Sequence, residues 1–168
     1  METQVKKNYI LDREVASRKM LRMAYEILEN NIDEPSLVLA GIRESGSVVA
    51  RNIQRMLSTI SPVHTEMITV TLDKREPRDV RLSQTLDFDG RVVVVVDDVA
   101  NSGKTLLYAL KPFLEFQPKK IQTLVLVARS HNAFPVHPDY TGLSIATTLQ
   151  EHIYVEVEGE EILGAYLQ

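Results

Sequence analysis

An unbroken run of five valines, residues 92–96, is followed directly by two aspartates, Asp97 and Asp98. β-Branched residues favour strands, and a strand without a polar position suits a parallel sheet that helices cover on both faces. Burying carboxylates beside a strand costs free energy unless a hydrogen-bond donor or a cation pairs with them. The segment therefore predicts an α/β fold with an acidic site at the end of one buried strand.

The rest of the chain alternates between segments whose apolar residues have the spacing of a strand and segments whose apolar residues have the spacing of a helix. Short apolar or β-branched runs predict further strands at residues 36–40, 64–72, 121–127 and 153–157. Apolar residues at helical spacing predict helices over residues 12–29, 46–57 and 105–116. Residues 73–84 are charged and predict a surface loop. We expect one α/β domain over residues 1–168, with a mainly parallel sheet flanked by helices.

Composition excludes several classes of protein. The 168 residues are 44% hydrophobic, have a net charge of -4 and include no cysteine. A disulfide framework, a thiolate zinc site and a cysteine nucleophile are therefore excluded. No signal peptide is evident at the N-terminus, and no apolar run is long enough to cross a bilayer, so we expect a soluble, cytoplasmic protein. The acidic balance offers no overall attraction to nucleic acid.

The residues after the acidic pair predict a phosphate site. Ligands of open α/β sheets bind beyond the carboxyl ends of the strands, where the next helix begins with free N–H groups. Gly103 allows close approach of the backbone, and Ser102 and Thr105 add hydroxyl donors. The two carboxylates, as acceptors, suit the vicinal hydroxyls of a sugar. Together these residues predict a site for ribose 5-phosphate.

Two alternatives compete with this interpretation of the segment. Residues 102–105 match the end of a P-loop, but the first glycine of that motif falls at position 98, which is Asp98. A carboxylate there would repel a nucleoside triphosphate. The second alternative is an ordinary turn between a strand and a helix, with an acidic pair that has no function.

The whole segment resembles the signature of type I phosphoribosyltransferases, which bind 5-phosphoribosyl 1-diphosphate (PRPP). Residues 38–46 fall where this family has its pyrophosphate loop. Residues 12–29 and 125–142 are similar to the branch of pyrimidine attenuation regulators and uracil phosphoribosyltransferases. The resemblance implies that Asp97 and Asp98 bind the ribose hydroxyls. It also implies that the 5-phosphate is held by the loop Ala100, Asn101, Ser102, Gly103, Lys104 and Thr105.

The same resemblance assigns the remaining parts of the site. It implies a flexible hood loop over residues 73–81, whose Lys74 and Arg75 act with the two aspartates in catalysis. A pyrophosphate loop would comprise Arg43, Glu44, Ser45 and Gly46, and the residues facing the base would be Ala128, Arg129 and Tyr154. No metal site built by the protein is expected. Mg²⁺ would instead arrive bound to PRPP.

Three positions depart from the family's pattern. Asn101 stands where purine-salvage relatives have an aspartate, and an amide cannot act as a general base. Ala128 replaces a polar residue that reads the base, and Ser45 replaces an arginine of the pyrophosphate loop. The identity of the base therefore stays open.

The implied function is transfer of ribose 5-phosphate from PRPP to a nucleobase with release of pyrophosphate. Uracil or another pyrimidine is favoured, and a purine remains an alternative. A second possibility is a PRPP-sensing regulator that binds RNA and has weak or no catalysis, with a basic patch at Arg13, Arg18 and Arg22. A third is a partner-binding domain that merely keeps the site. We also expect a homodimer or a larger homo-oligomer.

Overall fold

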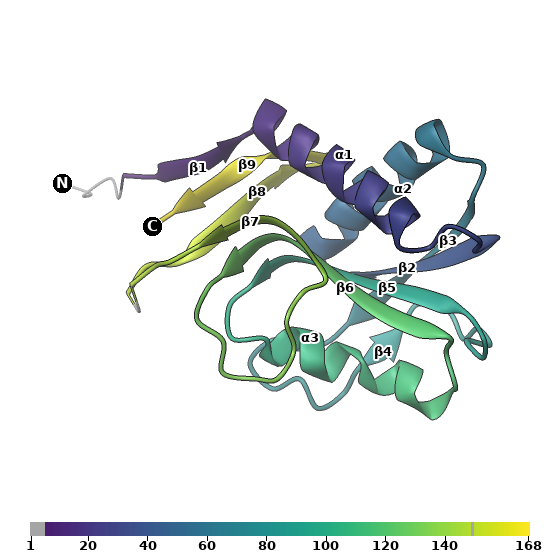
Figure 1. Cartoon of the computed structure of the whole chain (residues 1–168). Coiled ribbons are helices and arrows are strands. Elements are labelled where there is room, and N and C mark those ends of the chain that lie inside the picture. Colours follow the sequence, from purple (N-terminus) through teal and green to yellow (C-terminus); the bar gives the residue numbers. More distant parts are fainter. Residues whose placement is uncertain (1–5, 149) are drawn as a thin grey trace.

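The computed structural model describes residues 6–148 and 150–168, whose strands form two sheets (Figure 1). The larger sheet has six strands in the order β4-β3-β2-β5-β6-β7. All neighbours in it are parallel except β3 and β4, which are antiparallel. Its strands are β2 (Ser36–Ile42), β3 (His64–Thr71), β4 (Arg81–Leu82), β5 (Val92–Ala100), β6 (Lys120–Arg129) and β7 (Tyr140–Ile145). The mainly parallel sheet is confirmed.

Helices cover this sheet on both faces. Helices α1 (Arg13–Glu29) and α2 (Ser45–Ile60) lie on one face, and α3 (Lys104–Ala109) lies on the other with the 3₁₀ helix η1 (Lys111–Glu115) (Figure 1). The valines of β5 alternate between the two layers. Val92, Val94 and Val96 belong to the core under α1 and α2, and Val93 and Val95 belong to the core on the α3 side. All five are fully buried, as the sequence predicts.

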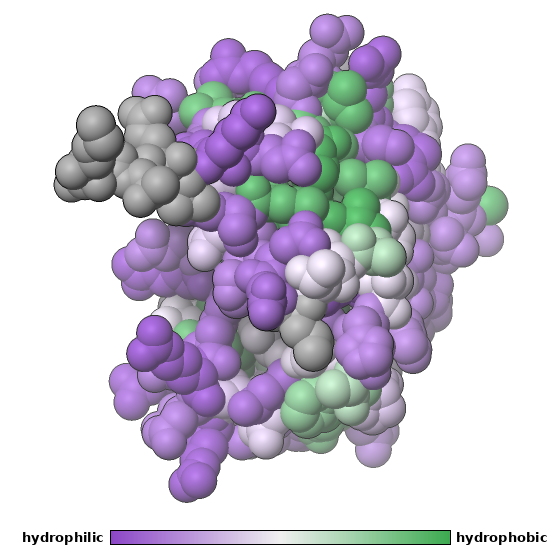
Figure 2. All heavy atoms as spheres, turned by 90° about the vertical axis from the view of Figure 1, so that its left-hand side faces the viewer, coloured by the Kyte–Doolittle hydropathy of each residue, from purple (hydrophilic) through white to green (hydrophobic). Residues whose placement is uncertain are grey.

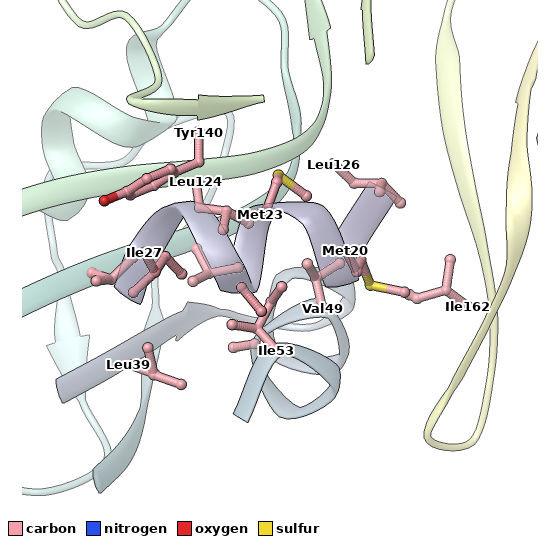
Figure 3. Packing of buried hydrophobic residues seen from close by; sticks show 14 of the residues in the cluster. Met20, Met23, Ile27, Leu39, Val49, Ile53, Leu124, Leu126, Tyr140 and Ile162 are labelled. Carbon is pink, nitrogen blue, oxygen red and sulfur yellow. The ribbon is translucent and has the colours of Figure 1, made fainter. Parts of the chain in front are cut away.

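The larger of the two cores joins elements from the whole length of the chain. Met20, Met23 and Ile27 of α1 belong to one cluster with Val49 and Ile53 of α2, and Met20 extends toward Ile162 (Figure 3). Strand residues close this cluster from the sides: Leu39 of β2, Leu124 and Leu126 of β6, Tyr140 of β7 and Ile162 of the strand β9 (Glu161–Leu167). Burial of this apolar area is the dominant favourable contribution to folding, and it holds α1 and α2 against the sheet.

A separate antiparallel sheet has the order β1-β9-β8, with β1 (Asn8–Asp12) and β8 (Ile153–Glu158) on either side of β9. Figure 2 shows this end of the molecule, where hydrophilic side chains surround a hydrophobic area. The sequence predicts only the strand near residue 153, because neither β1 nor β9 shows a clear alternation of apolar and polar residues. Asn8 of β1 pairs with Leu167 of β9, so no local pattern indicates that pairing, whereas β8 and β9 form a hairpin.

The structure corrects four expectations about the elements and their bounds. The helix expected over residues 105–116 ends at Ala109 and continues as η1, because Pro112 lacks a backbone N–H for an α-helical hydrogen bond. The loop expected over residues 73–84 contains the short strand β4, and β7 forms where no strand is predicted. Strand β5 also runs past the valines and includes Asp97 and Asp98. Among the described residues, no helix has both the length and the apolar character needed to span a membrane.

Candidate phosphoribosyl site

The acidic pair lies at the carboxyl end of β5, in the middle of the larger sheet. Asp97 is completely buried, and its Oδ1 accepts a hydrogen bond from the N–H of Asp98 at 2.8 Å. The Oδ1 atom of Asp98 accepts from the N–H of Val99 at 2.9 Å. These backbone donors hold both carboxylates at the strand end without using all of their acceptor capacity, because a carboxylate can accept several hydrogen bonds.

Lys74 of the hood loop (residues 73–81) contacts both carboxylates. Its Nζ lies 3.3 and 3.4 Å from the two carboxylate oxygens of Asp97 and 3.5 Å from Oδ1 of Asp98. Arg75 is exposed, and its backbone N–H donates to the side chain of Asp73 at 2.9 Å. Of the two hood residues assigned from the sequence, the structure brings Lys74 to the acidic pair and leaves Arg75 at the surface.

Burial and charge shift the ionisation of this group in a consistent direction. Burial, together with the neighbouring charge of Asp98, raises the pKa of Asp97 well above its usual value, and Lys74 opposes that rise. The pKa of Lys74 is also raised, since the carboxylates of Asp97 and Asp98 outweigh the opposing effect of burial. Without Lys74 nearby, the Asp97 carboxyl group would therefore ionise less readily. Its ionised form is stabilised by a neighbouring cation or by a hydroxyl group that donates a hydrogen bond to it.

The pyrophosphate loop (residues 43–46) packs directly against this pair because of a glycine. A Cβ atom at Gly46 would lie 2.8 Å from the carbonyl oxygen of Val96 and 3.0 Å from Oδ1 of Asp97. Glycine therefore lets the start of α2 approach the end of β5. Arg43, Glu44 and Ser45 line a cavity of about 870 Å³ that extends between α2, β3 and β8.

The phosphate loop (residues 100–105) surrounds a smaller cavity of about 220 Å³, which Lys74 also lines. Gly103 has a φ of 88°, a left-handed conformation that favours glycine. Its missing Cβ also leaves room for the neighbouring segment, since a Cβ would lie 3.0 Å from the side chain of Asn132. Ser102 Oγ accepts from the N–H of Lys104 at 3.3 Å, which orders the turn into α3.

A third cavity, of about 530 Å³, adjoins the phosphate loop. Its lining residues come from that loop and from the ends of β6 and β7: Asn101, Ser102, Arg129, Ser130, His131, Ala133, Thr147 and Thr148. Asn101 and Ser102 line the phosphate cavity as well, so the two spaces are neighbours. The N–H groups of Ala133 and Phe134 both donate to the carbonyl of Ser102 at 3.0 Å, which fastens the 131–136 segment to the phosphate loop.

The three residues assigned to the base by sequence lie in different surroundings. Arg129 lines the third cavity, whereas Ala128 is buried in the core on the α3 side of the sheet. Tyr154 lies on β8, is 45% exposed and stacks on Tyr166 of β9. The structure brings only Arg129 to this cavity. The sequence analysis does not single out Thr147 and Thr148, which also line this cavity, because threonine is common in loops and gives no signal of a binding site.

Comparison with known proteins agrees with this geometry. A model of the phosphoribosyl transferase domain matches residues 8–160. The bifunctional protein PyrR of Macrococcus caseolyticus is 36% identical over 162 residues, which cover 90% of this chain and 92% of that protein. The bifunctional protein PyrR of Fusobacterium nucleatum is 33% identical over 171 residues, with coverages of 94% and 97%.

Solved structures share the fold at lower sequence identity. The hypoxanthine phosphoribosyltransferase of Trypanosoma cruzi superposes with a TM-score of 0.77 at 15% identity, covering 96% of this chain and 97% of that one. A hypoxanthine-guanine phosphoribosyltransferase of Bacillus anthracis gives a TM-score of 0.76 at 19% identity, with coverages of 95% and 96%. The family match, the PyrR relatives and the paired acids at the end of β5 lead to one conclusion: the chain belongs to the type I phosphoribosyltransferases, in the branch of the bifunctional protein PyrR.

Proposed function

We propose that this phosphoribosyltransferase moves ribose 5-phosphate from PRPP to a pyrimidine base, with uracil favoured, and releases pyrophosphate. The observation that carries the proposal is the position of Asp97 and Asp98, which lie between the pyrophosphate loop and the phosphate loop. A ribose bridges its own 5-phosphate and 1-diphosphate, so a sugar site between two anion sites is the order that PRPP requires.

The proposed chemistry relies on positioning and electrostatics. The Asp97 and Asp98 carboxylates accept hydrogen bonds from the ribose hydroxyls, while the backbone and hydroxyl donors of residues 100–105 hold the 5-phosphate. The bond between C1 and the pyrophosphate oxygen breaks as a base nitrogen bonds to C1, and the ribose gains oxocarbenium character. The departing pyrophosphate takes up the proton that the base nitrogen loses. Negative charge near the ribose, from the acidic pair, stabilises that developing positive charge.

Departure of pyrophosphate requires positive charge. Arg43 lies in the pyrophosphate loop, and Lys74 projects from the hood loop to the acidic pair. Lys74 would have to leave the carboxylates when ribose binds, which frees its charge for the departing group. Closure of the hood loop would also exclude water that hydrolyses PRPP.

The donor set fits magnesium that arrives with PRPP. Among the described residues, no cluster of three or more metal-ligating side chains forms a cage. Mg²⁺ keeps several waters and needs only one or two carboxylates besides phosphate oxygens, and Asp98 offers such a group at the edge of the site. When bound, the ion supplies charge that offsets the leaving pyrophosphate. Asn101 can orient a base by hydrogen bonding but cannot accept its proton.

The test is release of pyrophosphate from PRPP and magnesium with uracil, hypoxanthine, guanine, xanthine, adenine and orotate in turn. We expect release with uracil. The double variant Asp97→Asn/Asp98→Asn should weaken PRPP binding at least tenfold, because two charge-assisted hydrogen bonds become neutral ones. Its circular dichroism spectrum should match that of the unmodified protein. Unchanged PRPP affinity in a folded double variant would remove the ribose assignment.

A second candidate function is regulation through RNA, which is favoured by the "bifunctional" name of the PyrR relatives. The proposed basic patch on α1 argues against strong affinity, since each arginine has an acidic partner. Arg13 contacts Glu161 at 2.5 Å, Arg22 contacts Glu26 at 2.6 Å, and Arg18 lies 3.9 Å from Glu14.

RNA binding can be tested through its salt dependence. Binding through phosphates weakens steeply with salt because counterions are released. A titration with single-stranded RNA between 50 and 200 mM salt, roughly the range over which phosphate contacts lose most affinity, separates an RNA regulator from a plain enzyme. Affinity that does not respond to salt would argue against the RNA role.

A further inference from the structure

Lys74 of the hood loop covers the acidic pair. The side chain of Asp97 is only 1% exposed, whereas that of Lys74 is 48% exposed. The Lys74 ammonium lies 3.3 and 3.4 Å from the two carboxylate oxygens of Asp97 and 3.5 Å from Oδ1 of Asp98. A sugar hydroxyl cannot reach a carboxylate that is sealed from solvent, so Asp97 can bind ribose only after a neighbouring group has moved.

The Lys74 side chain can move without disturbing the core. It belongs to a run of four exposed residues, 73–76, at the tip of the hood loop. The flanking parts of the loop are held more firmly, because Pro77 is buried and Leu72 and Val80 pack against the core on the α3 side. Lysine carries its charge on a flexible four-carbon stem. Its ammonium can therefore swing away from the carboxylates while the ends of the loop stay in place.

Lys74 also lies between the two proposed anion sites. On one side it lines the cavity of the phosphate loop. On the other side is the pyrophosphate loop: a Cβ atom at Gly46 would lie 3.0 Å from Oδ1 of Asp97, the same atom that the Lys74 ammonium contacts at 3.3 Å. A diphosphate held by the pyrophosphate loop would therefore lie within reach of this ammonium.

A diphosphate at that loop needs the positive charge that Lys74 carries. In the pyrophosphate loop, Nε of Arg43 lies 3.9 Å from Oε1 of Glu44, and Ser45 is uncharged, so the loop has no net positive charge. An ammonium that leaves two carboxylates for a diphosphate exchanges one set of ion pairs for another. A sugar phosphate without a diphosphate displaces the ammonium and gives it no such replacement.

We propose that Lys74 plugs the sugar site and is withdrawn by the diphosphate of PRPP, which makes the protein favour PRPP over sugar phosphates that lack a diphosphate. The inference rests on the proposed function, which places the ribose on the acidic pair. Specificity is a difference between two affinities, and the plug lowers the affinity for the wrong ligand. The same contact favours release of the nucleotide product, because the ammonium returns to the carboxylates once pyrophosphate has left.

Lys74→Met is the sharpest test of the inference. Methionine keeps a flexible, unbranched side chain and removes the ammonium. The variant should fold, because burial already raises the pKa of Asp97 and lets its carboxyl group hold a proton where no cation balances it. Lys111→Met is the matched control. It removes the same charge and another lysine contact of the hood loop, from Nζ of Lys111 to the carbonyl of Arg78 at 2.8 Å, and Lys111 lies outside the proposed site.

The measurement is calorimetric binding of PRPP and of ribose 5-phosphate, each with magnesium, to the unmodified protein and the variants. Lys74→Met should bind ribose 5-phosphate about tenfold more tightly, since a plug that is in place in about nine molecules of ten lowers the apparent affinity by that factor. It should bind PRPP no more tightly than the unmodified protein does, because the diphosphate loses its contact with the ammonium. Lys74→Arg, which keeps the charge, and Lys111→Met should both leave the affinity for ribose 5-phosphate within about twofold of the unmodified protein.

The outcomes separate this inference from the proposed function. Failure of the unmodified protein to bind PRPP would overturn the proposed function and the inference with it. Normal PRPP binding, with an affinity for ribose 5-phosphate that is unchanged or lower in Lys74→Met, would overturn the inference alone, because a lysine that only contacts the diphosphate has no effect on a ligand without one. An equal gain in Lys111→Met would also overturn it, since movement of the whole hood loop would then open the site. If circular dichroism shows that Lys74→Met does not fold, Lys74→Gln is measured in its place, with the same expected direction.

Discussion

Asp97 combines complete burial with an ionisable side chain. Its carboxyl group has a raised pKa because burial disfavours the ionised form and Asp98 adds a second negative charge. Lys74 relieves part of that cost at 3.3 Å. A sugar hydroxyl and magnesium-bound PRPP would relieve it in the liganded protein. The residue that we propose to bind the sugar is thus one whose ionisation destabilises the protein without ligand, a common cost of function.

This conflict predicts how stability depends on pH. A carboxyl group with a raised pKa in the folded state contributes most to stability below its unfolded value near 3.8, and that contribution is lost as pH rises through the folded pKa. Asp97→Asn should therefore melt at a higher temperature than the unmodified protein at pH 8, and the difference should shrink toward pH 4. The increase should be roughly 2–4 °C for each kcal/mol of ionisation cost that the amide removes.

Thermal unfolding of both proteins across this pH range, without PRPP, checks the expectation. A difference in melting temperature that stays constant from pH 4 to pH 8 would show that Asp97 ionises in the folded protein without cost.

At the scale of elements, the β1-β9-β8 sheet is joined by a row of aromatic side chains. Tyr9, Tyr166 and Tyr154 stand opposite one another on the three strands. Tyr166 occupies the middle: its ring centroid lies 5.5 Å from that of Tyr9 and 5.4 Å from that of Tyr154, and the ammonium of Lys7 lies 4.7 Å above it. Cross-strand aromatic pairs of this kind stabilise a sheet beyond the area they bury.

The middle position makes Tyr166 the more important ring. Each aromatic pair contributes about 0.5–1.5 kcal/mol, so Tyr166→Ala should lower the free energy of unfolding by about 1–3 kcal/mol. Tyr154→Ala loses the stack on Tyr166 and a tilted contact with His152, whose ring centroid is 6.4 Å away, but it keeps the Tyr9–Tyr166 pair and the Lys7 contact, so it should cost less. Urea denaturation of the two variants measures both losses in the free energy of unfolding. Equal losses would contradict the central role of Tyr166 among the three rings. Nucleotide affinity in Tyr154→Ala also tests the assignment of this residue to the base.

The sequence predicted an element correctly where its apolar residues follow one clear spacing, that of a strand or that of a helix. Val92, Val94 and Val96 on one face and Val93 and Val95 on the other follow from the pleat of a strand between two layers. The helix after Asp12 was predicted with its cap, whose Oδ1 accepts from the N–H of Val15 at 2.8 Å. The helix over residues 105–116 was too long in the prediction, because its apolar spacing hides the effect of Pro112 on hydrogen bonding.

At the scale of the whole molecule, the site is assembled from segments that lie far apart in sequence. The pyrophosphate loop follows β2, Lys74 follows β3, the acidic pair ends β5, and Arg129 ends β6. Parallel strands direct all four segments to one edge of the sheet, where ligands of such folds bind. PRPP would contact most of these segments at once and couple them.

Ligand binding should therefore stabilise the entire chain. A ligand at 100 times its dissociation constant adds about 2.7 kcal/mol to stability, which corresponds to a rise of roughly 5–11 °C in melting temperature for a chain of this length. Scanning calorimetry with PRPP and magnesium measures the shift, and ribose 5-phosphate with magnesium serves as the control that lacks the diphosphate. A melting temperature that does not respond to PRPP would contradict the shared site.

The amino-acid sequence alone determined the buried valine strand, the acidic pair at its end and the glycine-containing loop that follows. These features depend on neighbouring residues, whose spacing is set by the geometry of a strand or a turn. Only the tertiary structure decided that Lys74 meets Asp97, that Gly46 lies against Val96, and that Thr147 shares a cavity with Arg129. Such contacts join residues brought together by the packing of whole layers, and no local period in the chain records which distant segments will meet.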